Sequence, residues 1–230
     1  MIPRLLRLVP GLLLYGVADA FMVRAGIGVS PWLVFAQGIS IHSGISVGLL
    51  TNLIGLAVLL LWIPLRQRPG IGTVCNIMLV GPGIELGLWL LPSPDSLWVR
   101  IGFFAIGLVL LAVASGIYIG ARLGPGPRDG LMTGIHQRFG TPIWVGRTGV
   151  EATVLLVGWA LGGNAGPGTL AFALLIGPLC GITLPLLDPG ARRERRERRT
   201  SGAGRDAPQP RKPECETDES RYSTLSTTLL

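Results

Sequence analysis

Six long apolar runs dominate the pattern of hydrophobic and polar positions. They occupy residues 5–23, 45–65, 71–91, 97–121, 142–161 and 168–187. About 20 apolar residues are needed to cross a hydrocarbon core about 30 Å thick. The runs are unbroken and do not alternate with period two, which favours helices over the strands of a closed barrel. The pattern therefore predicts an all-α, polytopic transmembrane helical bundle of six spans.

Composition supports this class. The chain is 49% hydrophobic and 14% charged, with a mean hydropathy of +0.54, which is too apolar for an ordinary soluble domain. A net charge of +7 would suggest nucleic-acid binding, but ten of the twenty basic residues follow Pro189, outside the apolar part. Because no nucleic-acid-binding fold or aromatic platform accompanies them, we expect no nucleic-acid partner.

The end of the apolar pattern divides the chain into two parts. Residues 1–188 form the predicted transmembrane domain, with repeat one at 5–91 and repeat two at 97–187. Residues 189–230 are predicted to be a disordered cytoplasmic tail, because they are too polar to bury a core. Its basic cluster, from Arg192 to Arg199, is expected to hold anionic lipid headgroups.

Arginine in the short loops predicts the orientation. An inside N-terminus leaves only Arg24 and Arg100 outside, so both termini are expected on the cytoplasmic side of a bacterial plasma membrane. The first run also resembles a signal peptide that ends at Ala18-Asp19-Ala20. We favour a retained span, because the internal repeat makes this run the counterpart of a later one.

The repeat is the most informative feature of the sequence. The motif from Arg24 to Gly28 recurs from Arg122 to Gly126, and Gly70-Ile71-Gly72-Thr73 recurs as Gly166-Pro167-Gly168-Thr169. Three spans per repeat place the second half in the membrane in inverted orientation, as in many secondary transporters. The alternative is that duplication merely makes a stable bundle whose small residues allow close helix packing.

Each half also contains a short helical segment, at residues 31–40 and 129–138. Ser30 is expected to cap the first segment, and Pro31 suits the first helical position. Ten residues of helix rise about 15 Å, half a bilayer. The segments are therefore either re-entrant or interfacial; His136 to Arg138 favour the interface.

The candidate binding residues come from the paired R-x-G-x-G motifs and the polar positions after the second one. Glycines let backbone N–H groups approach a ligand, and arginine is suited to carboxylate or phosphate. The predicted substrate-binding set is Arg24, Gly26, Gly28, Arg122, Gly124, Gly126, Arg128, Asp129, Arg147 and Glu151. For the arginine motifs the alternative is a tight turn with a snorkelling side chain. Arg147 and Glu151, four apart on a helix, are also expected to form an ion pair.

Two further acidic residues lie within apolar runs. Asp19 and Glu85 are candidates for proton or ion coupling, because ionisable groups inside spans are costly and are usually functional. No spacing of Cys or His suits a metal, and no catalytic motif is present, so we expect no metal, no cofactor and no enzyme. The six tryptophans fall near span ends, which predicts interface anchors.

Three motifs carry a resemblance to a known family. They are Arg68-Pro-Gly-Ile-Gly-Thr73 with Asn76, the segment Gly120-Ala-Arg-Leu-Gly-Pro-Gly-Pro-Arg-Asp-Gly-Leu-Met132, and Gly158-Trp-Ala-Leu-Gly-Gly163. Residues 5–187 resemble the YczE-type bacterial integral membrane proteins of the YczE/YyaS/YitT grouping. The resemblance implies an uncharacterised multi-pass membrane protein and supplies no catalytic residues.

Together these features predict a transporter or exporter of a small solute, anionic solutes among them. An alternative is a membrane accessory protein that anchors or modulates a cytoplasmic enzyme through the tail, and a lipid-modifying enzyme ranks third. The expected partners are the lipid bilayer, the solute and anionic headgroups, and the chain is compatible with an oligomer.

Overall fold

The computed structural model describes residues 2–140 and 142–187, which form eight helices and contain no strand. The helices are α1 (Ile2–Ala25), α2 (Pro31–Ser43), α3 (Val47–Leu61), α4 (Ile71–Leu90), α5 (Leu97–Gly120), α6 (Pro127–Phe139), α7 (Ile143–Ala160) and α8 (Pro167–Leu187). The predicted all-α class is confirmed for these residues. The predictions for the tail, including the cluster from Arg192 to Arg199, lie outside them.

Four helices are long and apolar enough to cross a membrane, namely α1, α4, α5 and α8. The predicted count of six is therefore not reproduced. The 15 residues of α3 rise only about 22 Å, and α7 carries Arg147 and Glu151 among several small and polar residues. If α2 and α3, which meet at 115°, are taken as one bent span, the count is five.

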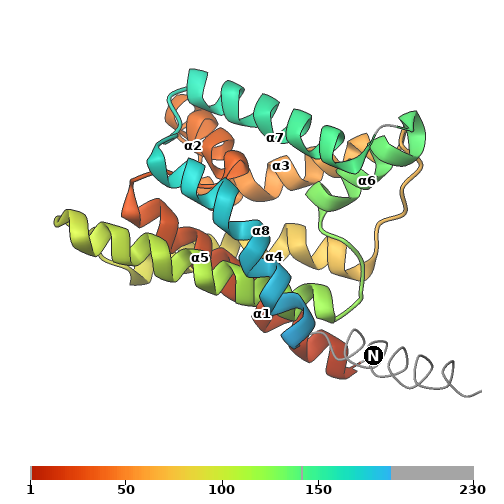
Figure 1. The fold of residues 1–230 in the computed structure, drawn as a ribbon, viewed down its shortest axis with the longest axis horizontal. Coiled ribbons are helices and arrows are strands. Elements are labelled where there is room, and N and C mark those ends of the chain that lie inside the picture. Colours follow the sequence, from red (N-terminus) through yellow and green to blue (C-terminus); the bar gives the residue numbers. More distant parts are fainter. Residues whose placement is uncertain (1, 141, 188–230) are drawn as a thin grey trace, which may run out of the picture. The chain divides into compact units, whose positions relative to one another are not determined.

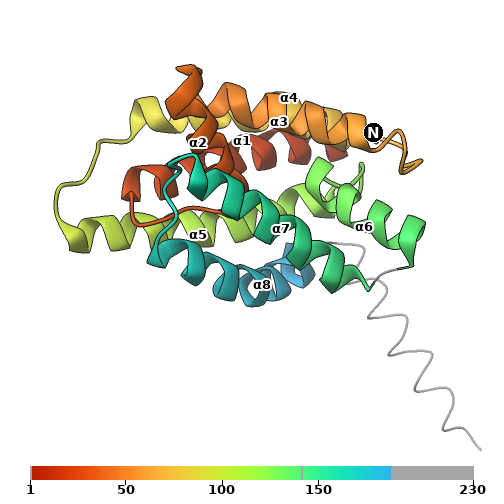
Figure 2. The same cartoon turned by 90° about the horizontal axis from the view of Figure 1, so that it is seen from above.

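The four long helices pack side by side in the order α4, α1, α5, α8. In Figures 1 and 2, α1 and α4 run in one direction while α5 and α8 run in the opposite one. Glycines set the closest approach: a Cβ on Gly16 of α1 would lie 2.3 Å from the carbonyl oxygen of Val80 of α4. Small residues at helix interfaces allow this backbone contact.

The remaining helices, α2, α3, α6 and α7, form a second group that packs in a ring and lies beside the row in Figure 1. Both short helices, α2 and α6, start with proline at their first position, where the missing N–H costs nothing. Most residues of their N-terminal halves are buried, with Asp129 of α6 exposed, and their last residues are exposed. Each therefore runs from the interior to the surface, and α6 begins two residues before the predicted start at Asp129.

The local backbone of the two halves recurs at one constant spacing. Gly28 and Gly124 both have φ of 127°, which suits only glycine, and Gly44 and Gly140 cap α2 and α6 with φ of 68° and 67°. Pro31 and Pro127 begin α2 and α6 at this same spacing. At this spacing Gly28 corresponds to Gly124. The comparison of the sequences paired Gly28 with Gly126, so the structure shifts the alignment of the two motifs by two residues.

Two backbone hydrogen bonds join the halves. The N–H of Gly72 in α4 donates to the carbonyl of Leu123, and the N–H of Gly168 in α8 donates to the carbonyl of Ile27, both at 2.9 Å. The loop that follows α5 is thereby tied to the first turn of α4, and the loop that follows α1 to the first turn of α8. Each half supplies the partner for an irregular loop of the other.

The tryptophans divide into two sets. Trp89, Trp98, Trp144 and Trp159 are between 62% and 81% exposed, as interface anchors would be, but Trp32 and Trp62 are buried. The prediction that all six are anchors is thus wrong for these two. The packing of α2 against α3 and α7, and of α3 against α6, encloses them inside the second group.

We predict that Gly16→Ala destabilises the α1–α4 contact, whereas Gly102→Ala in α5 does not. A Cβ at Gly16 meets backbone atoms, but one at Gly102 meets nothing within 4 Å. Alanine raises helix propensity equally at both sites, so the difference isolates the clash, which we expect to cost about 1–3 kcal/mol. Unfolding free energies in mixed micelles measure it; equal stability of the two variants would refute the close packing.

Candidate functional site

The first turn of α6 carries Arg128 and Asp129, and a buried tryptophan of α3 holds this turn in place. The indole N–H of Trp62 donates to the carbonyl of Pro127 at 3.0 Å. Gly130 leaves room for the ring, because a Cβ there would lie 2.0 Å from the indole. The position of the charged pair is therefore set by Trp62 and Gly130 together.

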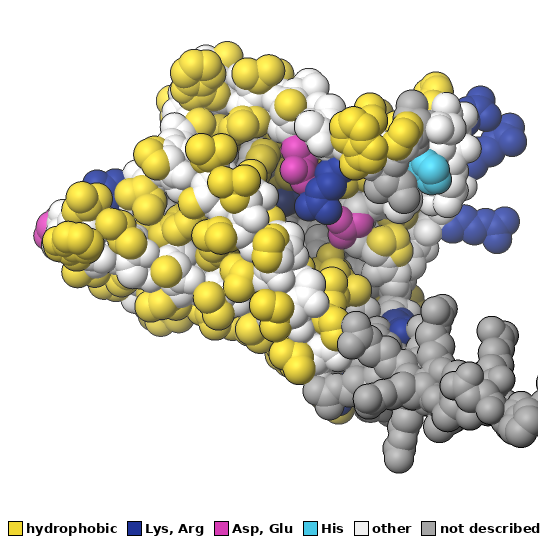
Figure 3. Space-filling view, viewed as in Figure 1, with side chains coloured by type: hydrophobic (Ala, Val, Ile, Leu, Met, Phe, Trp, Pro, Cys, Tyr) yellow, Lys and Arg dark blue, Asp and Glu magenta, His cyan; other side chains and the backbone are white. Residues whose placement is uncertain are grey.

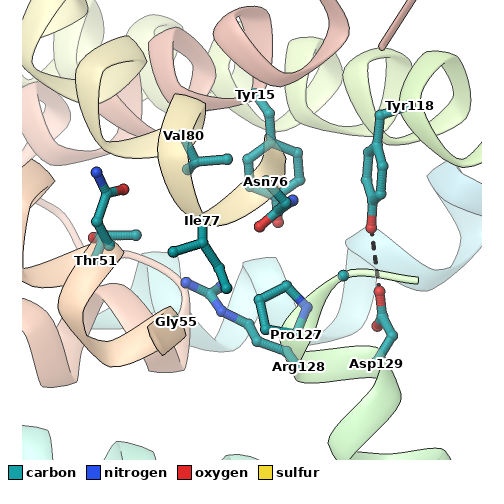
Figure 4. Close-up of a pocket in the computed structure, with 12 residues that line it drawn as sticks. Tyr15, Thr51, Gly55, Asn76, Ile77, Val80, Tyr118, Pro127, Arg128 and Asp129 are labelled. Carbon is teal, nitrogen blue, oxygen red and sulfur yellow. Dashed lines mark hydrogen bonds between the residues drawn. The ribbon is translucent and has the colours of Figure 1, made fainter. Parts of the chain in front are cut away.

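Two tyrosines from the long helices complete the centre of the site. The hydroxyl of Tyr118 in α5 donates to Oδ2 of Asp129 at 3.2 Å, and the rings of Tyr118 and Tyr15 pack edge to face with centroids 6.1 Å apart. Figure 4 shows Arg128 and Asp129 diverging from α6, with Asp129 turned toward Tyr118. We call Tyr15, Tyr118, Arg128 and Asp129 the central site.

Two cavities border the central site. The small cavity, of about 70 Å³, lies between α1, α3, α4 and α6 and is also lined by polar residues such as Thr51 and Asn76. The large cavity, of about 420 Å³, lies on the side of α2, α7 and α8. In Figure 3 charged side chains of both signs gather in a hollow that is bordered by hydrophobic side chains. Four charged residues line the large cavity: Arg128, Asp129, Arg147 and Glu151.

The two cavities are counterparts at the constant spacing that relates the halves. Matched lining pairs, small cavity first, are Thr51 and Arg147, Gly55 and Glu151, Asn76 and Phe172, Val80 and Ile176, Gly126 and Ser30, Pro127 and Pro31, and Arg128 and Trp32. The two halves share the same backbone arrangement around their cavities, while the side chains that line the cavities differ. The cavities therefore differ in size and in chemistry.

The small cavity is closed by contacts between α3 and α4. The N–H of Gly48 donates to Oε1 of Glu85 at 2.8 Å, and the N–H of Gly81 donates to Oδ1 of Asn52 at 2.9 Å. At the positions of α8 that match Gly81 and Glu85 stand Gly177 and Gly181, where a Cβ would meet nothing within 4 Å. The large cavity is accordingly open between α7 and α8.

Two hydrogen-bond donors in the wall of the large cavity have no partner. Ser30 Oγ and Trp32 Nε1 are buried and unbonded, although they belong to residues that line this cavity. Ser30 thus makes no capping hydrogen bond to α2, contrary to the expectation from its position. The guanidinium of Arg128 lies over the Trp32 ring, 5.1 Å from its centroid, a cation–π contact.

Half of the predicted binding residues meet at the cavities: Gly126, Arg128, Asp129, Arg147 and Glu151. The predicted ion pair is confirmed, with Arg147 Nε 3.3 Å from Glu151 Oε1. The others serve the loops. Arg24 donates to Ser93 Oγ at 2.8 Å and to the carbonyl of Leu88.

The glycine motifs shape the two irregular loops. Gly26 accepts a hydrogen bond from Arg100 at 2.8 Å, and Gly28, Gly124 and Arg122 adopt positive φ. These residues lie outside both cavities. Backbone geometry therefore explains their spacing in the sequence.

The two acidic candidates for ion coupling have different surroundings. Asp19 is 1% exposed, its Oδ2 has no hydrogen-bond partner, and Arg128 lies within Coulombic range of it. Glu85 accepts the bond from Gly48 that helps to close α3 on α4. Among the described residues, no group of three His, Cys, Asp or Glu side chains is placed to hold a metal ion.

Sequence reasoning missed the tyrosines of the central site and the two unpartnered donors. Tyr15 and Tyr118 sit inside apolar runs where nothing in the local pattern marks them. Ser30 and Trp32 were assigned to a cap and an anchor. One signal was available: at the corrected spacing, Ser30-Pro31-Trp32 aligns with Gly126-Pro127-Arg128.

Comparisons with known proteins place this site in a wider group. A family model described as a family of unknown function, DUF6198, matches residues 2–185. An uncharacterized protein of Haemophilus influenzae is 40% identical over 172 residues, 75% of this chain and 79% of its own length. The uncharacterized membrane protein YczE of Bacillus subtilis is 36% identical over 176 residues, 76% of this chain and 81% of its own length.

A third relative, the uncharacterized protein YyaS of Bacillus subtilis, is 28% identical over 182 residues, 77% of this chain and 90% of its own length. No solved structure matches. The resemblance to YczE-type proteins is confirmed by these matches.

We predict that Tyr118 and Asp129 are energetically coupled. In a double-mutant cycle, Tyr118→Phe and Asp129→Ala should show a coupling of about 0.5–1.5 kcal/mol in unfolding free energy, because each removes the same hydrogen bond. A control cycle pairs Tyr118→Phe with Thr133→Ala, whose hydroxyl bonds only to carbonyls of its own helix. Additive effects in the first cycle would exclude the bond.

Proposed function

Because the chain belongs to the DUF6198 family, whose function is unknown, we propose its role from the site: a membrane transporter of a small solute. The observation that carries the proposal is the pair of counterpart cavities on two sides of one central site, a small one narrowed where α3 packs on α4 and a larger one where α7 and α8 stand apart. A solute held at Arg128 and Asp129 is reachable from either cavity. Such an arrangement suits alternating access, in which the two repeats move around a fixed site.

The proposal includes an inverted repeat with three crossings in each half. In this topology the bent pair α2 with α3 counts as one crossing, and we assign its counterpart, α6 with α7, to one crossing as well. The opposite directions of α1 and α5, and of α4 and α8 (Figures 1 and 2), support this topology. Together with the arginine distribution, this proposed topology of six crossings puts both termini on the cytoplasmic side as part of the proposal.

In the proposed cycle, α7 closes on α8 while α3 separates from α4. In the other half of the cycle, α3 closes on α4 while α7 separates from α8. Packed interfaces tend to be bistable, so such an exchange occurs between two discrete states. Opening α3 from α4 breaks the bonds that Glu85 and Asn52 accept, each with a net stabilisation of about 0.5–1.5 kcal/mol. Glu85 then loses the hydrogen bond that it accepts from Gly48, which makes it, with the buried Asp19, our candidate for ion coupling.

Flux across a bilayer tests the function. We expect proteoliposomes that contain the full chain to exchange anionic compounds from a filtered bacterial metabolite extract, read by mass spectrometry of the vesicle interior. The double variant Arg128→Gln with Asp129→Asn should lose this exchange, because both charges of the central site are removed. An absence of flux under every gradient, together with no thermal shift on adding the extract, would reject the transporter.

Spin-label distances test the alternation. We expect labels at Leu156 in α7 and Leu174 in α8 to give two distance populations whose ratio shifts with the metabolite extract. Labels at the matched positions Leu60 in α3 and Met78 in α4 should shift in the opposite sense. All four side chains are at least 60% exposed, so labels fit without repacking. A single, unchanging distance for both pairs would rule out the exchange.

A further inference from the structure

Two residues that line the large cavity carry buried hydrogen-bond donors without a partner, and much of the remaining wall is apolar. We infer that this cavity binds an amphiphile with a single oxyanion head, carboxylate or phosphate. The head contacts Ser30, Trp32 and Arg128, and the apolar body lies along α8. The inference rests on the proposed function only in treating this amphiphile as the transported solute.

The donors point to the head group. Ser30 and Trp32 are 4% and 6% exposed, and neither Ser30 Oγ nor Trp32 Nε1 has a partner. Leaving a buried donor unbonded costs about 1–3 kcal/mol. Both atoms are shielded from solvent here, so a ligand acceptor recovers that free energy when a small shift of the two side chains turns them toward the cavity. Arg128 adds a positive charge over the Trp32 ring, and the N-terminus of α2, which begins at Pro31, adds a partial one.

The acidic residues indicate that the ligand carries no positive group. Glu151 is paired with Arg147 at 3.3 Å, and Asp129 accepts the hydroxyl of Tyr118. Among the described residues that line the cavity, each carboxylate already has a partner. The uncommitted groups in the wall are donors, which favours a monoanion over a zwitterion.

The rest of the wall suits an apolar body. It is lined by Leu111, Ile119, Met132, Phe172, Ile176 and Leu184. Gly177 and Gly181 expose the backbone of α8 with no side chain in front of it. A volume of about 420 Å³ lies within the range of small-molecule sites, about 300–1,000 Å³. The small cavity, with about 70 Å³ and Asn76 in place of Phe172, is too small and polar for the same molecule.

Figure 3 shows the charged hollow surrounded by hydrophobic side chains. Because the cavity opens between α7 and α8 onto this apolar face, an amphiphile has two possible sources, the bilayer or the aqueous phase. The recognised chemistry is the same for both. An anionic phospholipid and a short soluble fatty acid represent the two sources.

Binding to the purified full chain in dodecyl maltoside tests the inference. We expect octanoate to raise the melting temperature more than octanamide, its uncharged analogue, and more than butyrate, which lacks the apolar body. Ser30→Ala and Trp32→Phe should each weaken octanoate binding about 10-fold or more, since each removes a donor to a charged group. Trp98→Phe, at a side chain 81% exposed, is the control and should bind as the unmodified protein does.

Native mass spectrometry of the same sample distinguishes the sources. A phosphatidylglycerol retained by the protein, and lost in Ser30→Ala and Trp32→Phe, would support the inference with the bilayer as source; octanoate binding without retained lipid would support it with a soluble source. Equal shifts with octanoate and octanamide would overturn it. So would unchanged binding in both variants when their melting temperatures without ligand match that of the unmodified protein.

Failure of this inference and of the transporter are separable. Octanoate binding without any flux in proteoliposomes would reject transport and leave the binding site in place. Flux of polar metabolites that Ser30→Ala and Trp32→Phe do not change would reject the amphiphile and leave transport in place.

Discussion

The fold depends on how two irregular loops satisfy their backbone. Inside a bilayer an unpaired carbonyl or N–H costs several kcal/mol, so a break between helices persists only where protein supplies the partner. Here each half supplies it to the other: Leu123 accepts from Gly72 and Ile27 accepts from Gly168. These bonds stabilise the irregular loops that follow α1 and α5. Because the chain leaves the helical conformation there, α2 and α6 can begin inside the protein. The position of Arg128, in the first turn of α6, therefore depends on the loop that these hydrogen bonds stabilise.

On this shared frame the side chains produce two different cavities. In one half, Asn52 and Glu85 reach backbone N–H groups of the facing helix and draw α3 onto α4. In the other half, Thr148 stands in place of Asn52 and Gly181 in place of Glu85, so these bonds have no equivalent and the cavity stays open. The difference between the cavities therefore follows from two residue pairs within a common backbone.

The sequence predicted much of this where the signal was local. Glycine at positive φ and proline at a helix start leave a mark on composition, so the repeated motifs were visible, and the i, i+4 spacing predicted the pair of Arg147 and Glu151. The exact alignment of the two repeats was harder to predict, because the R-x-G-x-G motifs can be aligned on arginine or on glycine. The structure aligns Gly28 with Gly124, which share the same backbone φ.

Tertiary features were not predictable in this way. Tyr15 and Tyr118 lie in separate apolar runs and meet only through the packing of α1 on α5. The burial of Trp32 depends on α2 packing against α7. The pattern of apolar runs also does not separate α3 and α7, which pair with short helices, from the four helices that are long and apolar enough to cross alone. An apolar run gives the length of a helix, but not whether it crosses the membrane alone or with a partner.

The polar residues that distinguish the cavities also determine which of them is easier to close. Closing α7 on α8 would bury Arg147 and Glu151, of which Arg147 has a side chain 54% exposed. Removing an ion pair from water carries a desolvation cost that its mutual attraction often fails to repay. At the matched positions of the small cavity stand the uncharged Thr51 and Gly55, and the carboxylate of Glu85, which closing α3 on α4 also buries, accepts the N–H of Gly48 there. In the proposed cycle the protein alone therefore favours the state with the large cavity open, and closure would need a ligand whose own charge and hydrogen bonds replace the lost water.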